Sequence, residues 1–130
     1  MPVPKKRALI SIVDDDDDVR EAIRGLMRAL KFAAEAFSSA DEFLRSSKID
    51  LTACLIADIN MPGMSGLDLH RRLLELGKSI PTILITAYPT EDTRTLALES
   101  GVIKYLTKPF VEAELVDGVH AALAQSRRGG

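Results

Sequence analysis

The segment that decides the fold is Cys54-Leu55-Ile56-Ala57-Asp58, which leads into the loop sequence INMPGMSG at 59–66. A short apolar run that stops at a carboxylate and a loop with proline and glycine is typical of a buried strand in a parallel sheet. Comparable runs, which we also predict as strands, occupy 8–13, 33–37, 80–86 and 102–106. The sequence therefore predicts five strands, and 54–57 is the third of them.

A segment with helical periodicity follows each predicted strand. Apolar residues recur at spacings of three and four from Val19 to Leu30, and we expect Asp17 or Asp18 to cap that helix. Four more helices are expected. The second is short and begins with the capping-box pattern at 39–42, and the third contains Leu69, Leu73 and Leu76 and ends at Gly77. The fourth extends from Thr90 to Gly101, and the fifth has apolar residues at 115–123 and frays from Ser126. This alternation predicts an α/β fold, a doubly wound five-stranded parallel sheet with helices on both faces.

Composition limits the classes of protein that fit. The chain has 130 residues, 46% hydrophobic and 28% charged, and we expect one domain over 1–130 with a core at about 7–125 and flexible termini. A net charge of −2 argues against a protein whose main task is to bind nucleic acid. The single cysteine, Cys54, excludes an intramolecular disulfide, and no apolar run reaches the roughly 20 residues of a membrane span. We therefore expect a cytoplasmic protein without a membrane segment.

Reactive side chains follow four of the five predicted strands. Asp14 and Asp15 come after the first strand, Asp58 after the third, Thr86 after the fourth and Lys108 after the fifth. The carboxyl ends of parallel strands meet at one edge of a sheet, which is where open α/β sheets bind their ligands. Carboxylates a few ångströms apart repel each other by about 4 kcal/mol per pair at an effective dielectric constant near 20. A proton or a cation must relieve this repulsion, and an all-oxygen ligand set favours Mg²⁺.

The same residue types suit phosphoryl transfer. An ionised carboxylate can attack phosphorus and form an aspartyl phosphate, and a metal ion with a lysine can spread the charge on the transferred oxygens. The first strand–helix turn has no glycine-rich sequence of the kind that holds nucleotide phosphates. We therefore expect phosphoryl chemistry on a side chain and no nucleotide or other organic cofactor.

Four motifs in the expected order resemble the receiver domain of two-component response regulators. The similarity extends over about residues 7–125 and is greatest to receivers of the nitrogen-fixation regulator type. It implies a flavodoxin-like (βα)₅ fold. The matching stretches are Val13-Asp14-Asp15, 58–66 (DINMPGMSG), Thr86-Ala87 and 105–110 (YLTKPF).

The resemblance implies a role for each residue at the predicted sheet edge. Asp58 would accept a phosphoryl group from a histidine kinase. Asp14, Asp15 and Asp58 would hold Mg²⁺ together with the backbone carbonyl of Asn60. Lys108 would pair with the phosphoryl group.

It also implies a conformational switch around this site. Thr86 would bond to a phosphoryl oxygen and move toward it, and Tyr105 would then swing inward. The Lys108-Pro109 peptide is expected to be cis. Asn60 and Tyr88 occupy the two positions that tune hydrolysis of the acyl phosphate in the family.

The partners follow from the same resemblance. We expect a sensor histidine kinase or a histidine phosphotransfer protein as phosphodonor. A homodimer would form through the face made by the helix from Thr90, the strand at 102–106 and the last helix. The chain would catalyse only its own phosphorylation and dephosphorylation and would not be an enzyme in the turnover sense. We expect no binding to nucleic acid or membranes by this chain.

Two alternatives fit parts of this pattern. A haloacid dehalogenase-type phosphatase also combines Asp, Thr, Lys and an acidic pair, but here the acidic pair precedes the nucleophile, and Asn60 replaces the general acid. A receiver fold that binds or dimerises without phosphorylation usually lacks one reactive residue, and none is missing here. Among the remaining polar residues, we expect His70 and His120 at the surface.

Overall fold

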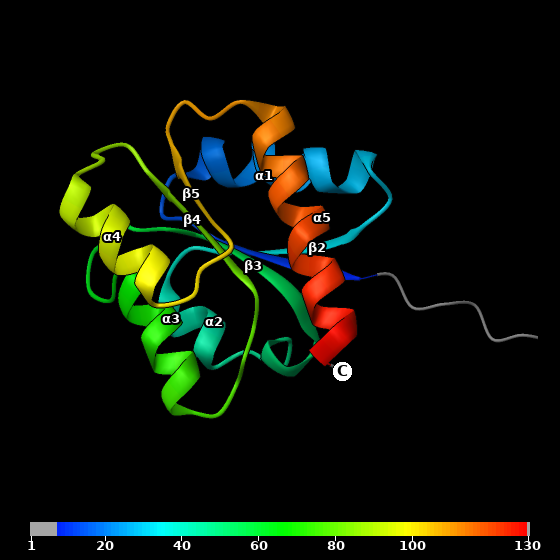
Figure 1. Cartoon of the computed structure of the whole chain (residues 1–130). Helices are drawn as coiled ribbons and strands as arrows, with labels where there is room; N and C mark the ends of the chain where they lie inside the picture. Colours follow the sequence, from blue (N-terminus) through cyan, green and yellow to red (C-terminus); the bar gives the residue numbers. More distant parts are fainter. Residues whose placement is uncertain (1–7, 130) are drawn as a thin grey trace, which may run out of the picture.

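The computed structural model describes residues 8–129 and confirms the predicted architecture (Figure 1). One parallel sheet has the strand order β2-β1-β3-β4-β5. The elements are β1 (Leu9–Val13), α1 (Asp17–Ala29), β2 (Ala33–Phe37), α2 (Ala40–Leu44), the 3₁₀ turn η1 (Ile49–Leu51), β3 (Thr52–Asp58), α3 (Gly66–Glu75), β4 (Thr82–Thr86), α4 (Glu91–Glu99), β5 (Lys104–Thr107) and α5 (Glu112–Gly129). The expected flexible residues at 1–7 and 130 lie outside the described residues.

Helices cover both faces of this sheet. Figure 1 shows α1 and α5 on one face and α2, α3 and α4 on the other. Each face has its own apolar core: Ile23 of α1 packs in one, and Phe43 of α2 in the other. The central strand β3 contributes to both, because Ile56 and Leu55 point to opposite faces. A strand buried on both faces reads as a continuous apolar run, which is why 54–57 identifies the fold.

Strand boundaries differ from the prediction by up to two residues. β3 begins at Thr52, two residues before the expected run, because Thr52 is itself buried and its hydroxyl bonds to that of Ser11 over 2.7 Å. β5 begins at Lys104 rather than at 102. At the end of the chain, α5 continues through Gly129, past the fraying expected from Ser126.

The N-cap of the first helix is Asp16, the residue before the two expected candidates, Asp17 and Asp18. Asp16 caps α1: its backbone is extended, and its Oδ1 accepts hydrogen bonds from the N–H groups of Asp18 and Val19 at 2.9 and 3.2 Å. Asp17 and Asp18 lie in the first turn, where their negative charges interact favourably with the positive end of the helix dipole. A run of aspartates offers several equivalent caps, so only the backbone direction after β1 decides among them.

The capping box expected at 39–42 is half formed. Ser39 accepts a hydrogen bond from the N–H of Glu42, but the Glu42 carboxylate bonds to Ser38 rather than to the Ser39 backbone. These bonds to Ser38 lower the pKa of Glu42. A complete capping box instead begins α3, where Ser65 and Asp68 bond reciprocally.

The expected surface position of His70 was also wrong. His70 is only 4% exposed because it lies on the sheet-facing side of α3, next to Leu69 and near Leu73. Its Nδ1 is the one fully buried side-chain nitrogen or oxygen without a hydrogen-bond partner in the described part of the chain. His120 is exposed on α5, as expected.

Candidate functional site

The carboxyl ends of the strands bring together the reactive residues that the sequence places there. Asp58 and Thr86 are the last residues of β3 and β4, and Asp14 and Lys108 directly follow β1 and β5. Backbone pairing continues past the strand ends, since the Lys108 N–H donates to the Thr86 carbonyl over 2.8 Å. The pairing of the strands thus fixes the position of the backbone at each of these residues.

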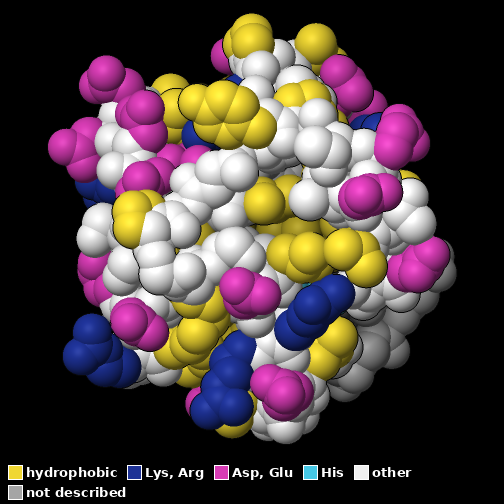
Figure 2. Space-filling model, turned by 90° about the vertical axis from the view of Figure 1, so that its left-hand side faces the viewer, with side chains coloured by type: hydrophobic (Ala, Val, Ile, Leu, Met, Phe, Trp, Pro, Cys, Tyr) yellow, Lys and Arg dark blue, Asp and Glu magenta, His cyan; other side chains and the backbone are white. Residues whose placement is uncertain are grey.

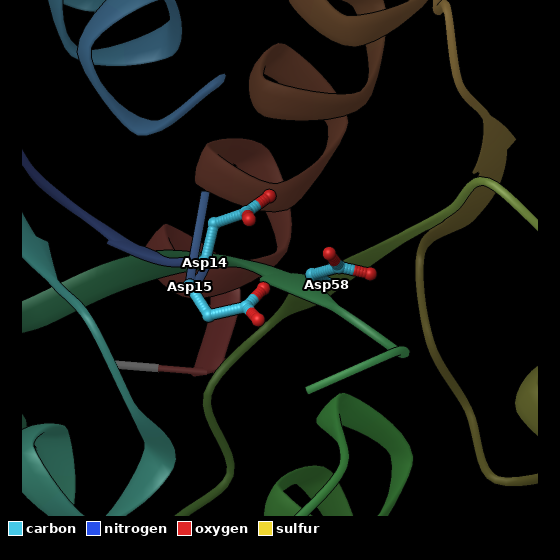
Figure 3. Close-up of side chains that lie close together, drawn as sticks. All are labelled: Asp14, Asp15 and Asp58. Atoms are coloured by element: carbon cyan, nitrogen blue, oxygen red, sulfur yellow. The ribbon is translucent and has the colours of Figure 1, made fainter. Parts of the chain in front are cut away.

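Three carboxylates form an acidic cluster at this edge. One carboxylate oxygen each of Asp14, Asp15 and Asp58 lies within 4.8 Å of the others. Figure 3 shows Asp14 and Asp15 at the end of β1, with Asp58 beside them at the end of β3. Asp14 and Asp58 are 2% and 5% exposed, whereas Asp15 is open to solvent. An all-oxygen cluster with one solvent-facing side suits a hard cation that keeps part of its water shell.

Lys108 joins two of these carboxylates. Its Nζ donates to Oδ2 of Asp58 over 2.8 Å and to Oδ2 of Asp14 over 3.1 Å. Burial alone would lower the pKa of Lys108, but the hydrogen bonds and charges of Asp58 and Asp14 outweigh it and raise that pKa. The lysine therefore stays charged, and it is well placed to meet any anion at Asp58. The Lys108-Pro109 peptide is cis, as expected.

Backbone groups hold the two buried carboxylates in place. The N–H of Asn60 donates to Oδ1 of Asp58 over 2.8 Å, so both oxygens of Asp58 have a partner. The N–H of Asp16 donates to Oδ1 of Asp14 over 2.9 Å. Burial raises the pKa of Asp14, although the bonds from Asp16 and Lys108 act in the opposite direction. The raised pKa means that the hydrogen bonds to the Asp14 carboxylate do not fully offset the cost of burying its negative charge. A bound cation would offset the rest of that cost.

Two further residues support this arrangement: Arg20, which the sequence did not identify, and Gly66, the last residue of the motif at 58–66. The Arg20 guanidinium reaches back from α1, donates to the carbonyl of Asp14 over 2.7 Å and pairs with Asp17. Gly66 begins α3 against the backbone of Asp58, and a Cβ there would lie 2.4 Å from the Asp58 carbonyl oxygen. The ion pair of Arg20 with Asp17 can be predicted from their spacing of three residues on one helix. No local sequence pattern predicts the hydrogen bond from Arg20 to the carbonyl of Asp14, or the close approach of Gly66 to the backbone of Asp58.

Thr86 sits next to the acidic cluster in a buried position, 1% exposed. Its hydroxyl donates to Oδ1 of Asn60 over 2.5 Å and accepts a hydrogen bond from the N–H of Tyr88 over 3.0 Å. The side chain of Tyr88 itself is 73% exposed. Asn60 therefore contacts the site twice, through its N–H at Asp58 and through its side chain at Thr86.

Tyr105 lies on β5, and its hydroxyl faces α4 rather than the carboxylates. The hydroxyl is 2.9 Å from Oγ1 of Thr93 and accepts a hydrogen bond from the N–H of Thr90 over 3.4 Å. The ring is 9% exposed, and the Arg94 guanidinium lies over it at 6.0 Å from the centroid. The residue expected to act as a switch is thus buried and bound to the start of α4.

No helix among residues 8–129 is both long enough and apolar enough to cross a membrane.

Comparisons with known proteins agree with this geometry. A family model described as the response regulator receiver domain matches residues 10–120. The response regulator protein TodT of Pseudomonas putida is 42% identical over 118 residues, which cover 91% of this chain and 52% of TodT. The transcriptional regulatory protein FixJ of Azorhizobium caulinodans is 31% identical over 121 residues, which cover 93% of this chain and 57% of FixJ.

Comparison with a solved structure also shows similarity to a response regulator. The response regulator StyR has a TM-score of 0.87 and 35% identity to this chain, and the match covers 94% of this chain and 62% of StyR. The chain spans little more than half the length of the curated relatives it matches. The family match over most of the chain and the (βα)₅ sheet lead to one conclusion: the chain belongs to the receiver domain family of two-component response regulators.

Proposed function

We propose that Asp58 accepts a phosphoryl group from the phosphohistidine of a partner kinase or histidine phosphotransfer protein. A carboxylate oxygen of Asp58 attacks phosphorus, and the bond from phosphorus to the histidine nitrogen breaks with its electron pair left on the imidazole. The observation that carries this proposal is the pair of hydrogen bonds from Lys108 to Asp58 and Asp14. They hold a cation where the charge of the transferred group would develop.

The neighbouring residues have complementary tasks in this proposal. Lys108 exchanges its bond to Asp58 for one to a phosphoryl oxygen and so stabilises the added charge. Thr86 donates its hydroxyl proton to another phosphoryl oxygen, which requires it to leave Oδ1 of Asn60. Its movement is coupled to Tyr105, whose buried position accompanies phosphorylation.

The residues at the cluster fit Mg²⁺. Asp14, Asp15 and Asp58, with the backbone carbonyl of Asn60, would hold it, since three close carboxylates supply the hard oxygen ligands this ion prefers. When bound, the ion neutralises carboxylate and phosphoryl charge during transfer. The two buried aspartates contribute fixed ligands, whereas exposed Asp15 can adjust.

The chain acts as a switch in this proposal, not as an enzyme with turnover. It catalyses its own phosphorylation and the slow hydrolysis of the aspartyl phosphate. We propose that Asn60 and Tyr88 tune that hydrolysis; the side chain of Asn60 and the backbone N–H of Tyr88 both contact Thr86. We assign no nucleotide or organic cofactor.

Partner binding is proposed for the face of α4, β5 and α5, where a second copy of the chain would dock. The side of the molecule on which α4 lies has hydrophobic side chains at its surface among charged ones (Figure 2). Leu96 and Leu98 of α4 are 42% and 45% exposed, which supports this surface. We propose a cytoplasmic location, which the single, buried and unpaired Cys54 supports. We propose no contact with nucleic acid or membranes by this chain.

A phosphorylation-independent docking module is the alternative. It is not favoured, because Asp14, Asp15, Asp58, Thr86 and Lys108 are all present and lie at one sheet edge.

The test is intact-mass spectrometry after incubation with acetyl phosphate, with and without Mg²⁺. We expect one added phosphoryl group on the wild type, dependent on Mg²⁺, and none on Asp58→Asn. Asp41→Asn, which changes an exposed aspartate on α2, is the matched control and should be phosphorylated normally. No adduct on folded wild type, and no binding of the stable mimic fluoroberyllate, would overturn the proposal.

A further inference from the structure

Three hydroxyl groups form a closed network between β5 and the start of α4. Tyr105 contacts Thr93 over 2.9 Å, and Thr93 contacts Oγ1 of Thr90 over 2.8 Å. Thr90 is the N-cap of α4, and its Oγ1 accepts a hydrogen bond from the N–H of Thr93 over 3.1 Å. The switch tyrosine is therefore bonded to the residues that begin a helix.

One arrangement of the protons satisfies all of these contacts at once. Each hydroxyl has one proton to donate. Thr93 donates to the carbonyl of Thr90 over 3.1 Å, so it can only accept from the other two hydroxyls. Tyr105 therefore donates to Thr93 and accepts from the Thr90 N–H, and Thr90 also donates to Thr93. In this arrangement the hydroxyl of Thr93 accepts hydrogen bonds from both Thr90 and Tyr105.

The same network reaches the phosphoryl site through the loop between β4 and α4. At one end of this loop the N–H of Tyr88 bonds to the hydroxyl of Thr86, and at the other the N–H of Thr90 bonds to the hydroxyl of Tyr105. A displacement of Thr86 moves a loop whose far end is held by Tyr105 and Thr93.

We propose that Thr93 is a positioning residue that holds Tyr105 in its buried conformation and so favours occupation of the phosphoryl site. This inference rests on the proposed function, in which buried Tyr105 accompanies phosphorylation. Apparent affinity is the intrinsic affinity multiplied by the populated fraction of the competent conformation. A hydrogen bond that stabilises buried Tyr105 therefore tightens binding at Asp58 without touching the bound group.

The test measures fluoroberyllate affinity in saturating Mg²⁺ for wild type, Thr93→Val, Thr93→Ser and Tyr105→Phe. Valine has the shape of threonine but lacks the hydroxyl, and we expect it to weaken apparent affinity about threefold to tenfold, the usual range for one hydrogen bond. Serine keeps the hydroxyl and should restore most of the affinity. The double variant Thr93→Val with Tyr105→Phe should be no weaker than the weaker single variant, because both remove the same bond.

A second measurement follows the ring itself. Protection of the Tyr105 ring protons from a dissolved paramagnetic agent, observed by NMR and assigned with Tyr105→Phe, should fall in Thr93→Val and recover in Thr93→Ser. Wild-type affinity and ring protection in a folded Thr93→Val variant would overturn the inference, as would additive effects in the double variant. Failure of wild type to bind fluoroberyllate would instead count against the proposed function, and ring protection would still decide whether Thr93 positions Tyr105.

Discussion

Nζ of Lys108 lies 2.8 Å from Oδ2 of Asp58, although the two residues are 50 positions apart in the sequence. The contact forms because β3 and β5 flank β4 in the sheet and all three strands point the same way. Lys108 thereby provides the counter-charge for two buried carboxylates. In the proposed function, stability, metal binding and phosphorylation would therefore all depend on the same few atoms.

Replacement of Lys108 by methionine should destabilise the folded domain by about 1–3 kcal/mol in the absence of Mg²⁺, because two buried carboxylates lose a charged donor. Urea unfolding monitored by circular dichroism measures the free energy of unfolding. Lys78→Met is the matched control: it breaks an ion pair with Asp50 whose carboxylate is mostly exposed, and should cost at most about 1 kcal/mol. Equal losses in the two variants would contradict a special role for the buried pair.

Added Mg²⁺ should raise the melting temperature, because the ion binds the folded cluster and relieves repulsion among its carboxylates. At ten times the dissociation constant, linkage predicts about 1.4 kcal/mol of added stability. Asp15→Asn should weaken this response, whereas Asp18→Asn, in the same acidic run but outside the cluster, should keep it. A melting temperature independent of Mg²⁺ in the wild type would disprove the metal site.

Gly66→Ala should destabilise the domain by about 1–3 kcal/mol and slow phosphorylation of Asp58, because the new Cβ would lie 2.4 Å from the Asp58 carbonyl oxygen. Gly25→Ala is the opposite case. Gly25 lies within α1 with no neighbouring atom within 4 Å of an added Cβ, so alanine there should stabilise by about 0.5–1 kcal/mol. Chemical denaturation measures the free energy of unfolding of both variants, and the kinetics of their reaction with acetyl phosphate measure the rate of phosphorylation. A neutral Gly66→Ala would show that α3 can shift away from β3 at no cost.

The stability of the domain should fall as the pH is lowered below about 6.5, in part through His70. Burial, followed by the nearby charge of Arg71, lowers the pKa of His70 from its ordinary value of 6.5. The unfolded chain then binds more protons than the folded one between the lowered pKa and 6.5, so stability rises with pH across this window and levels off above it.

The contribution of His70 is isolated by comparing unfolding free energies between pH 5 and 8 in wild type and His70→Gln. The wild type should show the steeper dependence. A His70→Gln variant with the full wild-type slope would assign the effect to other groups.

The sequence was sufficient for the architecture and for the residues at the sheet edge. Both follow from local signals: buried parallel strands read as apolar runs, and polar residues after such runs must meet at one edge. Asp14, Asp58, Thr86 and Lys108 were found in this way, and the structure brings them to one edge.

The predictions that failed depended on how helices sit on the sheet. The helical face that carries His70 points inward only because α3 packs directly over the strands, and the position of Asp16 as N-cap depends on the path of the chain after β1. Arg20 and Thr93 act on residues of other elements or loops, and no local pattern encodes such contacts. Tertiary packing, not propensity, decides these positions.

The contact of Lys108 with Asp14 spans 94 positions, so the cation of the site is synthesised after all three of its carboxylates. An incomplete chain that ends before β5 carries the clustered aspartates without their cation. The last strand, β5, therefore leads directly to the cation of the site, and the site is complete only when β1, β3, β4 and β5 are all in place. A ligand bound there would therefore stabilise the folded arrangement of these four strands relative to states in which one of them is displaced.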